Sequence, residues 1–310
     1  MYGGFPNKNL FINSVPRKKI NKLSLNGRSS LAMIIIAKKI KKIYIPFYIC
    51  EEVVKTIKKM NVEYEFYSIN KNLKPKFKYN SLIKNKDYYI LLIPYFGVVN
   101  LGSQWIKDKA IYDLSNAFYY KRYKLIYFFD SIRKFFHVNF GSNLNQDCFI
   151  DGYNKKKKKL LFYKPKNYED FRLNEKKHYI CLQNVNKIIS KDYFRINFYK
   201  IRKYREKNFY FLHYYLKKKN KLKFFIKDIR GPLYYPYLIN SGEDLRIYLN
   251  NKKIYNPNLW KEALNRKKIN YFSFEKKLIK DLVLLPIDEK IKTDDLIQIK
   301  NIIYQYEQKR

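Results

Sequence analysis

Short apolar runs alternate with helix-like segments along the first half of the chain. Leu31–Ala37 is continuously apolar and follows a Gly-Arg-Ser-Ser turn, which predicts a buried helix, and Glu51–Met60 has the periodicity of an amphipathic helix. Strands are expected at residues 43–46, 62–69, 88–96, 110–114 and 125–129. Apolar strands separated by helices are typical of a parallel sheet that is covered on both faces. The first half therefore predicts an α/β domain with a mostly parallel sheet.

The second half has a different pattern. Residues 192–219 predict a long, charged, aromatic-rich helix. Further strands are expected at 222–229, 234–239 and 283–287, and further helices at 242–249 and from Thr293 to about Gln308. Strands and helices in this mixed order fit a small α+β domain. We therefore expect a large cofactor-binding α/β domain over residues 1–190, followed by the long helix and a small C-terminal α+β domain over residues 191–310.

Length and composition exclude several classes of protein. The 310 residues are 46% hydrophobic, which is enough for a sizeable core and excludes a globally disordered chain. No stretch of about 18 uninterrupted apolar residues predicts a membrane span, and Met1–Phe5 does not begin a signal peptide. Cys50, Cys148 and Cys181 are too few and too scattered for a disulfide framework or a cysteine-type zinc site, which favours a reducing, cytoplasmic compartment.

The net charge has two explanations. The chain carries 66 Lys and Arg against 26 Asp and Glu, a formal charge of +40. Such a surface can bind nucleic acid, because basic side chains neutralise phosphates. A bias toward A/T-rich codons also explains it, since Lys, Asn, Ile, Tyr and Phe are all abundant. The lysines are spread over the whole chain, and the dense run Lys155–Lys159 suits a solvated loop, so we favour the bias and do not expect nucleic acid as a partner.

Three polar clusters lie where strands end or helices begin. Lys134 follows an apolar strand in an aromatic setting that could desolvate its amine and suit Schiff-base chemistry, although a lysine there is often simply solvated. Asp113 ends another strand, where it could pair with a cationic heterocycle or cap a helix. Gly27–Ser30 precedes a helix whose first amides suit a phosphate, or it is a plain N-cap. Along the chain the phosphate-type turn comes first, the strand-end Asp113 second and the strand-end Lys134 third, and this order matches the general plan of pyridoxal phosphate sites.

Stretches along nearly the whole chain match one known family. They lie at residues 27–31, 45–50, 64–67, 95–97, 113–118, 131–136, 231–237, 254–257 and 285–288. The chain resembles the pyridoxal-phosphate-dependent sugar aminotransferases of the DegT/StrS type, in one of their short branches. The most specific matches are Ser-x-Arg-Lys at 131–134 and Asp-x-x-Asn-Ala at 113–117. The resemblance implies a fold-type-I aminotransferase architecture, pyridoxal phosphate as cofactor, and a homodimer with active sites at the subunit interface.

The resemblance also implies roles for individual residues. Lys134 falls at the lysine that binds the cofactor covalently, and Asp113 falls at the partner of the pyridinium nitrogen. Asn116 falls where a Gln or His usually contacts the cofactor. Ser131 falls at a phosphate ligand, and the Gly27, Arg28 and Ser29 segment falls at the turn where the phosphate docks. Lys134 and Asp113 are therefore the expected catalytic residues, and all seven are expected to bind the cofactor.

Three positions depart from the family pattern. The loop after the lysine usually reads Gly-Val-Pro-Asp-Gly in the short branch, whereas here His137–Gly141 keeps only Val138 and the last glycine. Arg28 replaces a common threonine, so the phosphate contact would be re-made. The position that often stacks an aromatic ring on the cofactor falls near Cys50, and Phe47 or Tyr48 could substitute for it.

These observations leave three functions open. The first is a pyridoxal phosphate-dependent aminotransferase, which takes an amino group from a small amino donor and passes it to a keto group, in this family usually on a nucleotide-linked sugar. The second is a cofactor-binding protein or pseudo-enzyme of the same fold, which the altered loop favours. The third, less supported, is a basic nucleic-acid-binding protein. His178 and His213 have no partner at metal-ligand spacing, so no metal is expected, and His137 could touch substrate or pack in its aromatic run.

Overall fold

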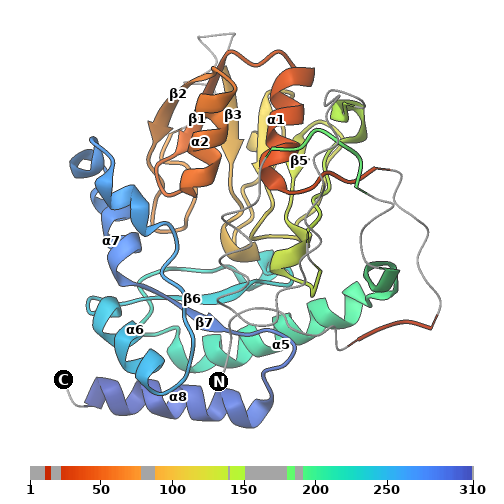
Figure 1. Cartoon of the computed structure of the whole chain (residues 1–310). Coiled ribbons are helices and arrows are strands. Elements are labelled where there is room, and N and C mark those ends of the chain that lie inside the picture. Colours follow the sequence, from red (N-terminus) through yellow and green to blue (C-terminus); the bar gives the residue numbers. More distant parts are fainter. Residues whose placement is uncertain are drawn as a thin grey trace.

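The first half of the chain builds a parallel sheet in the computed structural model, which describes residues 11–14, 22–77, 88–138, 140–150, 180–185 and 191–308 (Figure 1). Within these residues the sheet has five strands in the order β2-β1-β3-β4-β5, all parallel. They are β1 (Lys42–Pro46), β2 (Glu63–Tyr67), β3 (Tyr88–Leu92), β4 (Ala110–Asp113) and β5 (Tyr127–Phe129). Because the strands are parallel, their carboxyl ends share one edge, where such sheets bind ligands.

Two helices lie side by side against this sheet, α1 (Gly27–Ala37) and α2 (Glu51–Lys59) (Figure 1). α1 packs on the β5 side and α2 on the β2 side. Asn26 caps α1 by accepting a hydrogen bond from the Ser29 N–H. The Gly-Arg-Ser-Ser segment, expected as a turn before the helix, is therefore the first turn of α1 itself.

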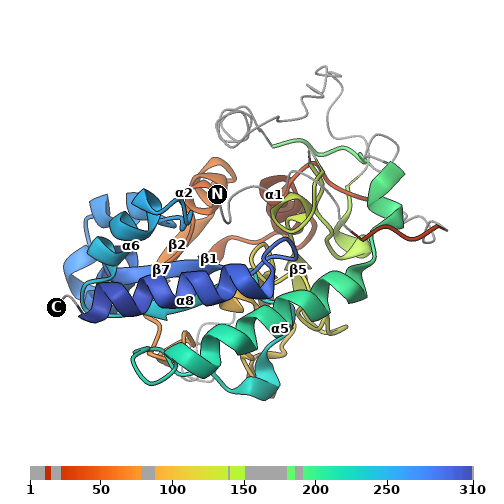
Figure 2. The ribbon, with the colours of Figure 1, turned by 90° about the horizontal axis from the view of Figure 1, so that it is seen from below.

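A two-stranded antiparallel sheet and four helices form the second half of the described chain. The elements are α5 (Phe198–Leu216), β6 (Tyr234–Leu238), α6 (Gly242–Asn251), α7 (Ser273–Asp281), β7 (Leu282–Pro286) and α8 (Thr293–Gln308). β6 pairs with β7 so that Tyr234 lies opposite Pro286. α5 and α8 pack together below this pair, as the view from below also shows (Figure 2). This half is the expected mixture of strands and helices.

Two expectations for the second half were wrong. The strand expected at 222–229 is absent, and a short 3-10 turn occupies Ile226–Asp228. Its apolar pattern is misleading because Phe225 and Ile226 are 52% and 58% exposed rather than buried. The long helix begins at Phe198 instead of 192, because a short 3-10 helix, Lys191–Arg195, precedes it and the Asn197 side chain caps it.

One hydrophobic cluster runs through both halves, from Ile45 in β1 to Leu284 in β7. The sheet and the C-terminal elements therefore share buried apolar surface. The division at residues 190 and 191 stays a prediction, and the predicted loop at Lys155–Lys159 lies outside the described residues. None of the helices that the structure describes combines the length and the apolar character needed to cross a bilayer.

Candidate active site

Lys134, Asn116 and Asp113 meet at the carboxyl edge of the parallel sheet. Asp113 is the last residue of β4 and pairs in register with Phe129, the last residue of β5. The chain then leads from β5 into a short 3-10 turn, Ile132–Lys134. Lys134 Nζ donates a hydrogen bond to Asn116 Oδ1 at 3.2 Å. The topology thus brings together three residues that the sequence places in two separate segments.

The Asp113 carboxyl is buried, with 7% of the residue exposed. Its Oδ1 accepts a hydrogen bond from the Ser115 N–H at 2.9 Å. Burial raises the pKa of Asp113 above its ordinary value, and the positive charge of Lys134 and the hydrogen bonds from Ser115 only partly offset that effect. A carboxyl with a raised pKa, close to an amine, is suited to share a proton with a heterocyclic nitrogen.

A separate hydrophobic cluster holds the Lys134 turn in place. Ile132, Phe135 and Phe136 are all completely buried in it. The turn is also tied to the next segment, because the Ile132 N–H donates to the Gly141 carbonyl at 3.0 Å. The half-buried Lys134 side chain therefore projects from a backbone that is fixed on both sides.

The first turn of α1 lies against the ends of β4 and β5. A Cβ added at Gly27 would lie 3.3 Å from the Asp130 carbonyl oxygen and 3.4 Å from Ser115 Oγ. Any side chain at position 27 would therefore crowd these strand ends. This places the α1 N-terminus beside the Asp113 and Ser131 segments.

The side chains of Arg28 and Ser29 are engaged by other protein groups. Arg28 Nη1 forms an ion pair with Glu52 Oε2 at 2.6 Å. Ser29 Oγ donates to Asn26 Oδ1 at 3.1 Å and accepts from the Cys181 N–H at 2.9 Å. Ser131 is buried, at 4% exposure. The phosphate roles of Gly27, Arg28, Ser29 and Ser131 stay predictions.

Phe47 and Tyr48 do not present free rings at this edge. Phe47 is fully buried and stacks on Phe272, with ring centroids 4.1 Å apart. Tyr48 is 1% exposed, and Trp260 packs edge-on against it at 4.5 Å. The suggestion that one of them stacks on a cofactor is therefore not supported.

Sequence reasoning missed a chain of buried serine hydroxyls beneath the α1 N-terminus. Ser30 Oγ lies 2.6 Å from Ser24 Oγ and 2.7 Å from Ser142 Oγ, and Ser142 Oγ donates to the Asp130 carbonyl at 2.6 Å. The three serines are completely buried. The chain ties the first turn of α1 to the end of β5. Serines give no periodic signal, so only the fold could reveal it.

The residues present suit pyridoxal phosphate by their chemistry. The amine of Lys134 and the buried carboxyl of Asp113 are the two groups that such sites require for attachment and for the ring nitrogen. The amides at the α1 N-terminus are a general anion-binding feature. Where the cofactor phosphate would bind, fewer side chains are available, since Arg28 and Ser29 already interact with other protein groups.

Solved structures share this fold. No protein-family profile matches the sequence, and no curated protein matches it. A DegT/DnrJ/EryC1/StrS aminotransferase from Brucella abortus is 12% identical, with a TM-score of 0.66 over 92% of this chain and 85% of that chain. Sugar aminotransferase CalS13 from Micromonospora echinospora is 10% identical, with a TM-score of 0.61 over 91% and 86%. 3-Amino-5-hydroxybenzoic acid synthase is 8% identical, with a TM-score of 0.67 over 93% and 86%.

These likenesses confirm the expected fold class. The mixed α/β architecture with its five-stranded parallel sheet matches fold-type-I aminotransferases, and the structural neighbours are of the DegT/StrS type that the sequence motifs indicate. At identities of 8–12%, the likeness concerns the fold alone.

Proposed function

We propose that this protein is a pyridoxal phosphate-dependent aminotransferase that passes an amino group to a keto group of a nucleotide-linked sugar or a similar small molecule. The main support is the meeting of Lys134, Asn116 and Asp113 at the carboxyl edge of the sheet. Further support comes from the shared fold of sugar aminotransferases. One such neighbour, Spr1654 from Streptococcus pneumoniae, has been solved in PLP and PMP forms.

Each site residue has a physical role in this proposal. Lys134 Nζ would attach the cofactor and later move the proton that leaves the substrate Cα. Asn116 would orient that amine through the 3.2 Å hydrogen bond. Asp113 would bind the ring nitrogen, and its raised pKa favours a shared proton there. Ser131 and the first amides of α1 would hold the phosphate. When bound, pyridoxal phosphate supplies the electron sink that stabilises negative charge at Cα.

A small amino acid, glutamate or glutamine, is the proposed amino donor. The keto acceptor is proposed as sugar-linked, because several structural neighbours are described as sugar aminotransferases. The strongly basic surface, with its formal charge of +40, would raise the local concentration of an anionic nucleotide-linked substrate by electrostatic steering.

A second candidate is a protein of the same fold that binds the cofactor without turnover. It is favoured by the His137–Gly141 loop, which keeps little of the family pattern, and by the protein partners of Arg28 and Ser29. With those side chains engaged, fewer groups remain to fix the phosphate.

One spectroscopic titration separates the two candidates. Purified protein is mixed with pyridoxal phosphate, the unbound cofactor is removed, and the visible absorbance of the protein is followed, first alone and then with L-glutamate or L-glutamine. An aminotransferase develops an absorption band that the amino donor removes. A band that neither donor changes supports the binding-only protein, and the absence of any band contradicts both.

A further inference from the structure

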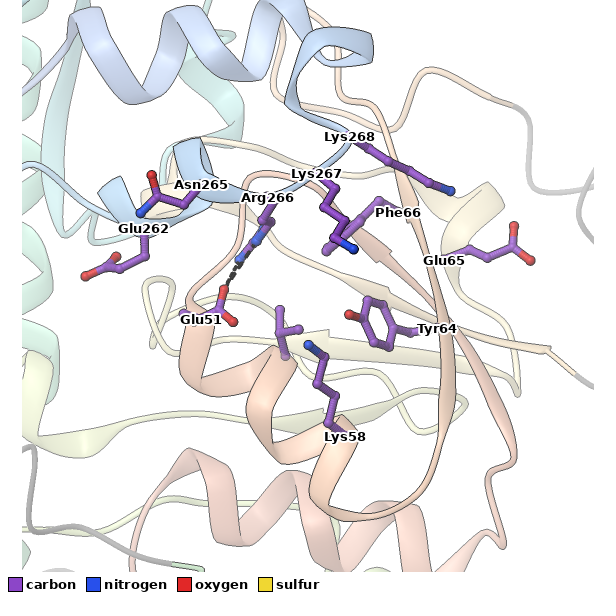
Figure 3. A pocket seen from close by; sticks show the side chains of 11 residues that line it. Glu51, Lys58, Tyr64, Glu65, Phe66, Glu262, Asn265, Arg266, Lys267 and Lys268 are labelled. Atoms are coloured by element: carbon purple, nitrogen blue, oxygen red, sulfur yellow. Dashed lines mark hydrogen bonds and ion pairs between the residues drawn. The ribbon is translucent and has the colours of Figure 1, made fainter.

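A cleft of about 620 Å³ lies between α2, the sheet-edge strand β2 and the segment 262–268 (Figure 3). Its lining residues are Glu51, Val54, Lys58, Tyr64, Glu65, Phe66, Glu262, Asn265, Arg266, Lys267 and Lys268. None of the residues proposed for catalysis or cofactor binding lines it. The volume is in the range of pockets that hold small molecules.

Arg266 fixes one wall of this cleft. Its guanidinium donates to the Phe47 carbonyl and, at 3.0 Å, to the Ile49 carbonyl, and it forms an ion pair with Glu51 at 2.9 Å. The same group lies over the Phe66 ring, 5.0 Å from its centroid. Arg266 and Glu51 thus balance each other's charge and anchor the backbone that carries the two following lysines.

The remaining polar groups of the cleft are arranged for an anion. Figure 3 shows the ammonium groups of Lys58 and Lys267 and the hydroxyl of Tyr64 pointing into the same part of the cleft. The carboxylates of Glu65 and Glu262 point away from it. Two lysines and a phenol are hydrogen-bond donors, and the two lysines are point charges of the kind that bind phosphate.

We propose that this cleft binds the phosphate group of a small phosphorylated ligand, held by Lys58, Lys267 and Tyr64. A phosphate oxygen accepts from each donor, and the negative charge relieves the repulsion between the two ammonium groups. A cationic ligand would meet that repulsion, and the carboxylates that could attract it are turned outward. The site stands independently of the proposed function, because it shares no residue with the candidate active site.

The test is calorimetric titration of the full-length protein with inorganic pyrophosphate at about 0.15 M salt, where long-range charge effects are screened. Lys58→Gln and Lys267→Gln should each weaken binding about tenfold, the loss of one charge-assisted hydrogen bond. Lys217→Gln is the matched control, because Lys217 lies 6.0 Å from the Tyr214 ring much as Lys58 lies 5.9 Å from the Tyr64 ring. Lys58 and Lys217 are both exposed, so neither substitution is expected to destabilise the fold.

A further variant locates the site within the cleft. Glu65→Gln should leave the affinity within about twofold, since that carboxylate faces away from the cleft. The proposal is overturned if pyrophosphate does not bind, if Lys217→Gln weakens binding as much as Lys58→Gln, or if neither cleft lysine matters.

Discussion

Replacement of Asp113 by asparagine should make the protein more stable and far less active. Asparagine has the shape of aspartate, and its Oδ1 can still accept the 2.9 Å hydrogen bond from the Ser115 N–H. What changes is the charge at a site where only 7% of the residue is exposed. If Asp113 served only to stabilise the fold, its replacement would lower the stability and leave the activity unchanged.

The direction of the stability change follows from the buried carboxyl. Burial raises the pKa of Asp113, so the folded protein binds this proton more tightly than the unfolded chain does. The ionised carboxylate therefore costs stability above the folded-state pKa, and this cost disappears below about pH 4, where the group is neutral in both states. Its removal should stabilise the apo-protein at neutral pH, and a single stabilising substitution commonly adds about 1 kcal/mol, or about 2 °C in Tm for a chain of this size.

Activity should move in the opposite direction. Without a carboxylate at the ring nitrogen, the transamination rate should fall by about 10²-fold, which corresponds to about 3 kcal/mol of transition-state stabilisation. Thermal unfolding at pH 7.5 and near pH 4, with single-turnover kinetics at neutral pH, measures both effects. If the variant is less stable at neutral pH and equally active, Asp113 serves only to cap the Ser115 turn, and its proposed catalytic role is wrong.

Two substitutions and a salt series test the fold and its assembly. Gly242→Ala should destabilise the protein by about 3 kcal/mol in urea unfolding, because the added Cβ would lie 1.7 Å from the Asp281 carbonyl oxygen; an unchanged midpoint would contradict this packing. Arg266→Ala should cost about 2 kcal/mol by the same measurement, since it removes the Glu51 ion pair and two bonds to backbone carbonyls, whereas the exposed Lys261→Ala should cost little. The chain should form a symmetric homodimer that buries more than about 2,000 Å². Because each subunit carries +40, sedimentation should show tighter dimers as salt rises, and monomers at every salt concentration would refute it.

The sheet could be predicted from the sequence because β3 and β4 are short and nearly continuous in apolar residues, and because the edge strand β2 alternates as a half-exposed strand does. Strand β1 and the last helix, α8, lie within a residue of their expected positions. The meeting of Asp113 and Lys134 was also predictable, since the ends of parallel strands share an edge. The family motifs indicated Asn116 as a site residue, whereas its hydrogen bond to Lys134 is seen only in the folded structure.

Other features depend on contacts that no local pattern encodes. The start of α5 is set partly by residues 11–13, because the Asn13 N–H donates to the Arg195 carbonyl and the Asn197 N–H donates to the Phe11 carbonyl. The phosphate role of Arg28 stays a prediction, and the fold adds an ion pair with Glu52 on the neighbouring helix that the sequence does not indicate. Side-chain partners of this kind are decided by packing between elements, which sequence spacing does not reveal.

The most direct test of the central claim is to find the lysine that pyridoxal phosphate modifies. The protein is incubated with the cofactor, reduced with borohydride, digested and analysed by peptide mass spectrometry. Among the many lysines of this basic chain, the account predicts one stoichiometric pyridoxyl label on Lys134, lost in Lys134→Ala while the circular dichroism spectrum is unchanged. A label on another lysine, or labels spread over the surface lysines with Lys134 unmodified, would contradict it.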